Sequence, residues 1–323
     1  MTNNIENLFD LAIKRIKDSE NIYIASHIQP DGDNIGSMLA LGMALNKIKK
    51  KVFILKSDNI PSDFLFLPNV DIIHDYRSED KIDIFIALDT SDENRLGQNK
   101  DLLSKAKTVI NIDHHISNTN FGSINIVDSK SAATGELVYN LINKMKISID
   151  KDIATCIYTA ISSDTGSFMY DNTTAETHEI VAELINIGID KSNININLYQ
   201  NRSIERTMLF INAVKSLNLY FDNKVVIVKV TQSMVEDSNA KMEDTEGIVS
   251  FIREIDCVEI AIILKEFKEK EIKVSMRSKR FADVSEICAN FGGGGHIRAA
   301  GCTINSTISI AEELILNELK KVF

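Results

Sequence analysis

The sequence predicts an α/β protein with two domains: an N-terminal domain built on a parallel sheet, then a smaller C-terminal domain of mixed α/β structure. Short apolar runs alternate with helical patterns through the first half, the arrangement that gives parallel strands joined by helices. A polar, asparagine-rich stretch at 189–201 interrupts this pattern, and apolar runs return after it. With 323 residues the chain is long enough for two hydrophobic cores.

The first elements of the N-terminal domain follow one another closely. Apolar residues at helical spacing between residues 5 and 18 predict an amphipathic helix. A β-rich run at 21–26 ends in a loop at 27–33 that contains proline and glycine, and residues 34–49 return to a helical pattern. Residues 51–55 form the next predicted strand. The unit is therefore a strand, an acidic loop and a helix.

Two further buried strands are predicted at 83–88 and 108–112, and polar side chains follow each directly. Asp89 comes after the first, and Asp113, His114 and His115 come after the second. Because ligands bind beyond the carboxyl ends of strands in open α/β sheets, we expect these side chains to form a site. An isolated histidine there would more often be a polar surface residue, but adjacent ones after a buried strand fit that alternative poorly.

The remaining elements divide between a helical stretch and the second domain. Helices are predicted at 131–145, 151–162, 174–187 and 203–217, with a turn at 163–168. We expect a first domain at 1–190, a linker and connecting helix at 191–217, and a second domain at 218–323. Within the second domain the sequence predicts strands at 224–230, 257–264 and 271–277, and helices near 243–254, 282–290 and 310–321. The alternating charges of 265–273 indicate a solvated hairpin.

Composition and charge exclude several classes of protein. Apolar residues make up 44% and charged residues 25% of the chain, which is ordinary for a globular protein. A net charge of -10 argues against a protein with a track for long nucleic acid, but leaves room for short nucleotides in a local cationic pocket. The four cysteines are scattered, and neither a signal pattern nor a membrane-spanning stretch is evident. We therefore expect a cytoplasmic protein with reduced thiols and no membrane contact.

Acidic and imidazole side chains recur at the predicted loops in a pattern that suits metal ions. Two carboxylates two residues apart on one tight loop, as at Asp31 and Asp33, repel each other unless a cation lies between them. The alternative for each aspartate alone is a turn or helix cap. Six ligands are more than one open site requires and suit two divalent cations about 3.5–4 Å apart, bridged by Asp89. Mixed carboxylate and imidazole donors favour manganese, iron, cobalt or zinc over magnesium. The six predicted ligands are His27, Asp31, Asp33, Asp89, His114 and Asp164.

Five motifs, in sequence order, resemble those of the DHH phosphoesterases. The resemblance covers nearly the whole chain and implies two Mn²⁺ ions, one held by His27 and Asp31, the other by Asp33, His114 and Asp164, with Asp89 bridging. It also implies that Asp113 orients a histidine and that His115 faces the substrate phosphate. The motifs are His27-Ile28-Gln29-Pro30-Asp31-Gly32-Asp33, the lone Asp89, Asp113-His114-His115, Ser163-Asp164-Thr165-Gly166, and Gly292-Gly293-Gly294-Gly295-His296-Ile297-Arg298-Ala299-Ala300-Gly301.

The last motif resembles the signature of the DHH-associated C-terminal domain. By this resemblance the glycine run and His296 close over the substrate, and Arg277 and Ser278 contact its phosphate. We also assign Arg298, which follows the run, to the substrate site. Glycines let a backbone approach a ligand closely, and the N–H groups of Gly292, Gly293, Gly294 and Gly295 can form an anion-binding nest. The alternative is a flexible hinge.

The function that the resemblance implies is hydrolysis of short nucleic acids. The substrates would be RNA or DNA oligonucleotides, cleaved to mononucleotides by a 3′–5′ oligoribonuclease, and 3′-phosphoadenosine-5′-phosphate (pAp), converted to AMP. Alternatives are a hydrolase of the linear dinucleotide pApA, a manganese pyrophosphatase, and a non-catalytic nucleotide-binding protein. We expect the site in the cleft between the domains. The sequence does not rank these substrates, and it leaves open whether the protein is a homodimer.

Overall fold

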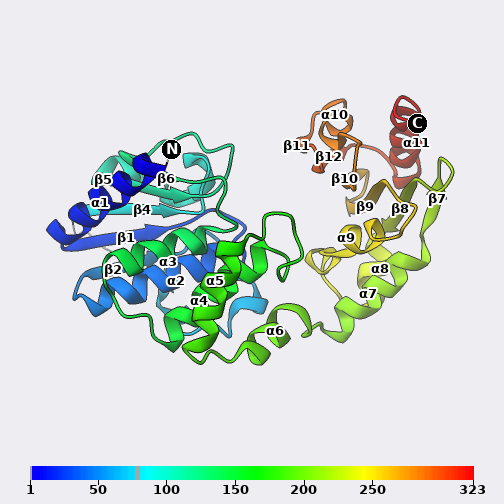
Figure 1. The fold of residues 1–323 in the computed structure, drawn as a ribbon. Helices are drawn as coiled ribbons and strands as arrows, with labels where there is room; N and C mark the ends of the chain where they lie inside the picture. Colours follow the sequence, from blue (N-terminus) through cyan, green and yellow to red (C-terminus); the bar gives the residue numbers. More distant parts are fainter. Residues whose placement is uncertain (1, 77–80) are drawn as a thin grey trace. The chain divides into compact units, whose positions relative to one another are not determined.

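The computed structural model describes residues 2–76 and 81–323, and the chain divides into two compact units, Met1–Asn201 and Arg202–Phe323 (Figure 1). Each unit contains one six-stranded sheet and is described by itself. In the part of the chain that the structure describes, no helix is both long enough and apolar enough to cross a membrane.

The first unit is built on a parallel sheet, as the sequence predicts. Its strands lie in the order β3-β2-β1-β4-β5-β6, and every neighbouring pair is parallel. Its elements are α1 (Thr2–Asp18), β1 (Asn21–Ala25), α2 (Gly32–Lys47), β2 (Lys51–Leu55), η1 (Ser62–Phe64), η2 (Val70–Ile72), β3 (Ile73–His74), β4 (Ile82–Leu88), η3 (Glu93–Lys105), β5 (Ala106–Asp113), β6 (Ile124–Val127), α3 (Thr134–Lys144), α4 (Lys151–Asp164), α5 (Ala175–Asn186) and α6 (Lys191–Tyr199).

This strand order creates a point at which the direction of chain winding reverses, between β1 and β4. In open parallel sheets the loops at such a point diverge to opposite faces and leave room for a ligand beyond the strand ends. His27 lies just after β1, and Asp89 follows β4 directly. The topology thus brings two of the predicted site residues to the same end of adjacent strands.

The strands are buried because helical segments cover both faces of the sheet. One face packs against α1, α2, α3 and α4 through a core that includes Ile24, Ile86 and Ile110. The other face holds a smaller cluster around Tyr23 and Phe85, to which the 3₁₀ segment η3 contributes. Figure 1 shows α2, α3, α4 and α5 as neighbouring helices beside this sheet.

The polar stretch predicted as a linker contains a helix, α6. Asp190 caps its N terminus by accepting a hydrogen bond from the Asn193 N–H at 3.0 Å, and Ile194 is buried in the core of the first unit. Its helical period is hidden because most of its other side chains are asparagines or lie on the surface. The short edge strand β6 was also missed, whereas α1, α2, β1, β2, β4 and β5 confirm the sequence predictions to within a few residues.

The second unit is a mixed sheet, also as predicted. Its strands lie in the order β11-β12-β10-β9-β8-β7, antiparallel except for the β8–β9 pair. Its elements are α7 (Ile204–Lys215), β7 (Asn218–Tyr220), β8 (Val225–Val230), α8 (Gln232–Asp237), η4 (Met242–Thr245), α9 (Ile248–Arg253), β9 (Ile260–Lys268), β10 (Glu271–Ser278), α10 (Val284–Ala289), β11 (Gly294–His296), β12 (Ala299–Ile304) and α11 (Ile308–Leu319).

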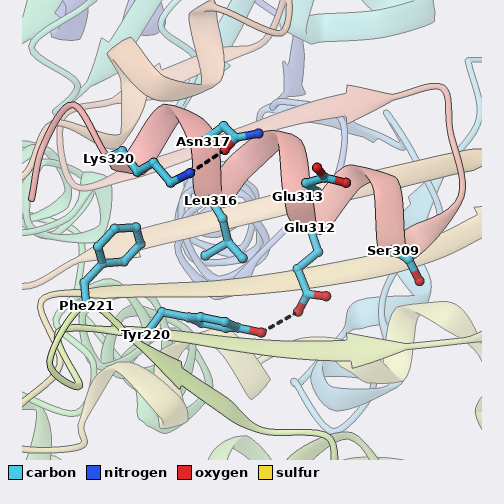
Figure 2. A pocket seen from close by; sticks show the side chains of 8 residues that line it. All are labelled: Tyr220, Phe221, Ser309, Glu312, Glu313, Leu316, Asn317 and Lys320. Carbon is cyan, nitrogen blue, oxygen red and sulfur yellow. Dashed lines mark hydrogen bonds between the residues drawn. The ribbon is translucent and has the colours of Figure 1, made fainter.

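Helices cover the two faces of this sheet with separate apolar clusters. Alternate residues of β9 and β10, such as Ile262 and Val274, pack under α10 and α11. The opposite face, with Val228 and Ile263, packs under α7 and α9. The edge strand β7 is tied to α11, since the Tyr220 hydroxyl donates a hydrogen bond to Glu312 at 3.0 Å (Figure 2).

Candidate active site

The six predicted metal ligands converge at the carboxyl end of the first sheet. Asp89 lies at the centre: one of its oxygens is 3.3 Å from His27 Nε2, and the other is 3.6 Å from His114 Nε2. His27, Asp31 and Asp89 form one group whose ligand atoms lie within 4.8 Å of one another, and Asp33, His114 and Asp164 form a second. Asp89, His114 and His115 form a third. The first two groups contain the residues that the family resemblance implies for the two cations, and the third adds His115.

The backbone at Asp89 is held in an unusual conformation. Its φ of +51° is left-handed, which few residues other than glycine adopt, although aspartate and asparagine tolerate it better than most. The Asp89 N–H donates to the Ile112 carbonyl at 3.0 Å, and the Thr134 hydroxyl donates to its carboxylate at 3.2 Å. Such strain is typical of functional sites. Here the Asp89 side chain is only 2% exposed and lies between His27, which follows β1, and His114, which follows β5.

Two of the aspartates also have structural roles. Asp31 caps α2, accepting from the Asn34 N–H at 3.0 Å with Oδ1, while its Oδ2 lies 3.7 Å from His27 Nε2. Asp33 accepts from the N–H groups of Thr134 and Gly135 at the N terminus of α3, at 2.6 and 2.8 Å. The capping alternative raised by the sequence is therefore correct for Asp31, and the same side chain also faces the cluster.

The histidines are oriented as metal-bound imidazoles usually are. His27 Nδ1 lies 2.7 Å from the Ile28 carbonyl, and His114 Nδ1 lies 3.3 Å from the Ser131 carbonyl. Because a carbonyl oxygen can only accept, Nδ1 is the donor in both rings and Nε2 is left toward the carboxylates. A metal-bound imidazole almost always donates its second ring N–H in this way.

The crowding of carboxylates is electrostatically costly without a cation. Burial, together with Asp89, Asp164 and Asp31, raises the pKa of Asp33 well above its ordinary value. Burial and the nearby Asp89 and Asp31 raise the pKa of Asp164 to about 6, although His114 acts the other way. Burial also disfavours a charged Asp89, but His27, His114 and His115 outweigh it and hold its pKa at about 2. These carboxylates and imidazoles are suitable ligands for divalent cations, whose positive charge would relieve the repulsion between the carboxylates.

His115 is positioned by a neighbouring acid, as the sequence predicts for Asp113. Asp113 is fully buried and lies 2.6 Å from His115 Nδ1, and this hydrogen bond, opposed by burial, raises the pKa of His115 to about 9. The Asn118 amide donates to the other Asp113 oxygen at 2.5 Å and to Asn111 at 2.8 Å. Sequence reasoning missed Asn118, because nothing in its loop marks it as facing Asp113.

The predicted substrate residues of the second unit occupy neighbouring strands. Arg277 lies on β10, paired with Ala299 of β12, which in turn pairs with His296 of β11. Ser278 points to the other face of β10 and is 1% exposed, so its hydroxyl is buried rather than presented with Arg277. Arg298 is exposed, and one of its N–H groups donates to the Ala282 carbonyl at 2.7 Å.

The first two glycines of the run end a helix. The N–H of Gly292 donates to Ala289 and that of Gly293 to Cys288, so these two amides are not free to form an anion-binding nest. A Cβ on Gly293 would lie 2.2 Å from the Gly301 carbonyl, whereas a Cβ on Gly294 would meet nothing within 4 Å. The glycine at position 293 therefore allows the chain to pack closely against β12. Neither an anion-binding nest nor a flexible hinge predicts this role.

Comparison with known proteins agrees with the motifs. Residues 21–161 match the family model for the DHH family, N-terminal domain, and residues 222–323 match that for the DHHA1 domain. The bifunctional oligoribonuclease and PAP phosphatase NrnA of Thermus thermophilus is 32% identical over 305 residues, which cover 93% of this chain and 89% of that protein. This chain belongs to the DHH family of phosphoesterases. It is accordingly a hydrolytic enzyme.

Two further proteins are similar to this chain over nearly the full length. A probable bifunctional oligoribonuclease and PAP phosphatase NrnA of Streptococcus mutans is 28% identical, over 97% of this chain and 98% of that protein. The crystal structure of an exopolyphosphatase-related protein from Bacteroides fragilis superposes with a TM-score of 0.92 at 29% identity, covering 98% of this chain and 96% of that one. The two-unit DHH and DHHA1 architecture thus extends along the whole chain.

Proposed function

We propose that this DHH phosphoesterase hydrolyses short oligoribonucleotides to mononucleotides and converts pAp to AMP. The names of the relatives from Thermus thermophilus and Streptococcus mutans support this proposal, because both alignments span at least 89% of each chain. The observation that carries it in the structure is the Asp89 carboxylate, which lies between the two ligand groups. A bridging carboxylate between two cations is the arrangement of two-metal phosphoester hydrolases.

In this proposal His27 and Asp31 would hold one divalent cation, Asp33, His114 and Asp164 would hold the other, and Asp89 would contribute to both. Two such cations, when bound, neutralise phosphate charge and lower the pKa of water. The mixed carboxylate and imidazole donors support Mn²⁺ as the metal. The hydrogen bond from His115 Nδ1 to Asp113 leaves Nε2 as the nitrogen that donates to a phosphate oxygen, where negative charge increases during hydrolysis.

Product analysis tests the proposal directly. The full-length protein is incubated with Mn²⁺ and either pAp, pApA, an RNA ladder from two nucleotides upward, or pyrophosphate, with a chelated sample as control. We expect AMP from pAp, mononucleotides from the dinucleotide, and rates that fall as the RNA grows longer. Equal rates on dinucleotides and long RNA would contradict the short-substrate proposal, and hydrolysis of pyrophosphate alone would replace it with a pyrophosphatase.

A further inference from the structure

The second unit contains a cavity of about 390 Å³ that no predicted motif describes apart from Arg277. Its floor is one face of β9 and β10, and its opposite wall is formed by η4 and the start of α9. The lining is polar and charged rather than apolar. The residues that matter here are Lys265, Ser275 and Arg277 on the strands, with Glu243, Glu246 and Ser250 on the wall.

Strand register explains why these side chains share a face. Ser275 and Arg277 are two residues apart on β10, so both point to the same side of the sheet. Ser275 pairs with Ile263 of β9, and Lys265 lies two residues beyond Ile263. Ile263 belongs to the apolar cluster under α9, and Arg277 pairs with Ala261 of the same cluster, so Lys265 and Arg277 flank the Ile263–Ser275 pair on opposite sides.

Lys265 is placed differently from the other lysines of this hairpin. It is half-buried, and among the described residues no carboxylate lies within 4.0 Å of its ammonium. Lys273, its partner across the strands, instead places its ammonium 3.6 Å from the ring centre of Phe267. Burial and the nearby Lys273 and Arg277 lower the pKa of Lys265, although Glu246 opposes them. An anion in the cavity would relieve this repulsion.

A second cavity of this unit has one lysine beside two glutamates, whereas the cavity at Lys265 has both Lys265 and Arg277 beside Glu243 and Glu246. The second cavity has a volume of about 420 Å³ and lies between β7 and α11 (Figure 2). Glu312 and Glu313 both line it, and its one lysine, Lys320, donates to Asn317 at 2.9 Å. The cavity at Lys265 is therefore the better candidate for an anionic ligand.

We propose that Lys265, together with Ser275 and Arg277, binds the phosphate at the end of the nucleotide that is not cleaved, the 5′-phosphate in the case of pAp. Glu243 and Glu246 face the same cavity and accept hydrogen bonds from ribose hydroxyls or base amino groups. This inference rests on the proposed function and adds to it a residue that selects substrates by their second phosphate. Residues 265–273 include the turn of the predicted hairpin, and residues 267–270 are exposed as expected, but Lys265 is half-buried and lines the cavity.

Calorimetric titration of the full-length protein tests this assignment without catalysis. The ligands are 5′-AMP and adenosine, which differ only in the phosphate, and chelator keeps the protein free of divalent metal. Lys265→Met removes the ammonium but keeps the length of the side chain. Lys265→Arg restores the charge. Lys268→Met is the matched control, because it makes the same change on the same strand at a 71% exposed side chain outside the cavity.

We expect Lys265→Met to weaken AMP binding about tenfold to hundredfold, the effect of losing one charged hydrogen bond, and to leave adenosine binding unchanged. Lys265→Arg retains most of the affinity, and Lys268→Met binds as the wild type does. If Lys265→Met does not fold, as judged by its circular dichroism and thermal unfolding, Lys265→Gln replaces it.

Two outcomes would overturn the assignment: equal losses for AMP and adenosine, or wild-type protein that binds AMP no more tightly than adenosine. Either result leaves the proposed function intact if the wild type still converts pAp to AMP with Mn²⁺. Conversely, preserved AMP selectivity without any hydrolysis of pAp or dinucleotides would contradict the proposed function and not the phosphate site.

Discussion

At the scale of single residues, two aspartates at opposite ends of β4 have the same chemistry but different surroundings. Asp89 follows the carboxyl end of the strand and faces three imidazoles, whereas Asp83 lies near its start and accepts from Lys107 and from the backbone of Asn21. The same substitution, aspartate to asparagine, can be made at both positions. Comparing the two variants therefore distinguishes a role in metal binding from a role in folding.

We predict that Asp89→Asn lowers activity on pAp by more than about hundredfold, because even supporting residues of metal sites cost 10–100-fold. Asparagine tolerates the left-handed backbone at this position, so the fold is retained. Metal content by mass spectrometry should fall with it, while Asp83→Asn keeps both metal and activity. Near-normal activity of Asp89→Asn in Mn²⁺ would contradict the bridging role.

A second residue-scale prediction concerns the orientation of His115. Asp113→Asn removes the acceptor that fixes Nδ1 as the donor, so kcat on pAp should fall by about 10–100-fold. Metal content should stay at the wild-type value, since Asp113 belongs to none of the groups of metal-competent side chains found among the described residues. A loss of metal instead of a loss in kcat would show that Asp113 acts on the cation site.

At the scale of secondary structure elements, Asp83 joins three strands. It accepts hydrogen bonds from the Lys107 ammonium on β5 and from the N–H groups of Asn21, the first residue of β1, and Glu20, which precedes it. These hydrogen bonds, that of Lys107 above all, hold the pKa of Asp83 at about 2 against the opposing effect of burial. Because the folded pKa lies below the ordinary value, the stabilisation is complete above about pH 4 and is lost as the pH falls toward 2.

We therefore predict that Asp83→Asn lowers the free energy of unfolding by about 1 kcal/mol at pH 7, a value reduced by the exposure of Lys107. The difference from wild type should shrink steadily between pH 4 and pH 2, as measured by urea unfolding at each pH. A difference that is independent of pH over this range would mean that the side chain contributes by shape and not by charge.

The glycine run offers a second element-scale prediction with an internal control. A Cβ at Gly293 would overlap the Gly301 carbonyl and the Cys302 Cβ, so Gly293→Ala should destabilise the protein by about 1–3 kcal/mol. Gly294→Ala, one residue later, meets open space and should be close to neutral in thermal unfolding. Equal effects of the two substitutions would indicate that flexibility of the run, rather than packing on β12, requires glycine.

At the scale of the whole molecule, the predicted site residues are divided between the two units. All six predicted metal ligands lie in the first unit, and Arg277, His296 and Arg298 lie in the second. A substrate too small to need the second unit should therefore respond to changes in the first unit alone.

We predict that Arg277→Ala weakens use of pAp by about 1–3 kcal/mol in kcat/KM, the range for losing a charged hydrogen bond. Hydrolysis of a minimal aryl phosphate should change much less, because that substrate carries no second phosphate. Parallel steady-state assays of both substrates provide the measurement. Equal losses would show that Arg277 serves folding or the metal site instead.

Local sequence patterns are sufficient to predict the fold class and to propose a cluster of candidate ligands at the strand ends of the first unit. Buried strands and amphipathic helices follow from local periodicity, and adjacent polar residues at strand ends must meet once those strands are parallel. The order of β1 and β4 in the sheet is not local information, but His27, Asp31, Asp89 and His114 can be proposed as ligands from the sequence because each lies next to a recognisable strand or turn.

The contacts between residues distant in the sequence could not be predicted from local patterns. Asn118 donates a hydrogen bond to Asp113 from a loop whose sequence shows no recognisable motif. The helix α6 packs on the first unit through the buried side chain of Ile194. Gly293 lies so close to the backbone of β12 that a Cβ atom would not fit there. Lys265 belongs to the same run of alternating charges as the exposed lysines of its hairpin. It lines a cavity because it lies beside the apolar cluster under α9, which the sequence pattern does not reveal. Burial and charge of a side chain depend on what packs over it, and that is set by residues distant in the sequence.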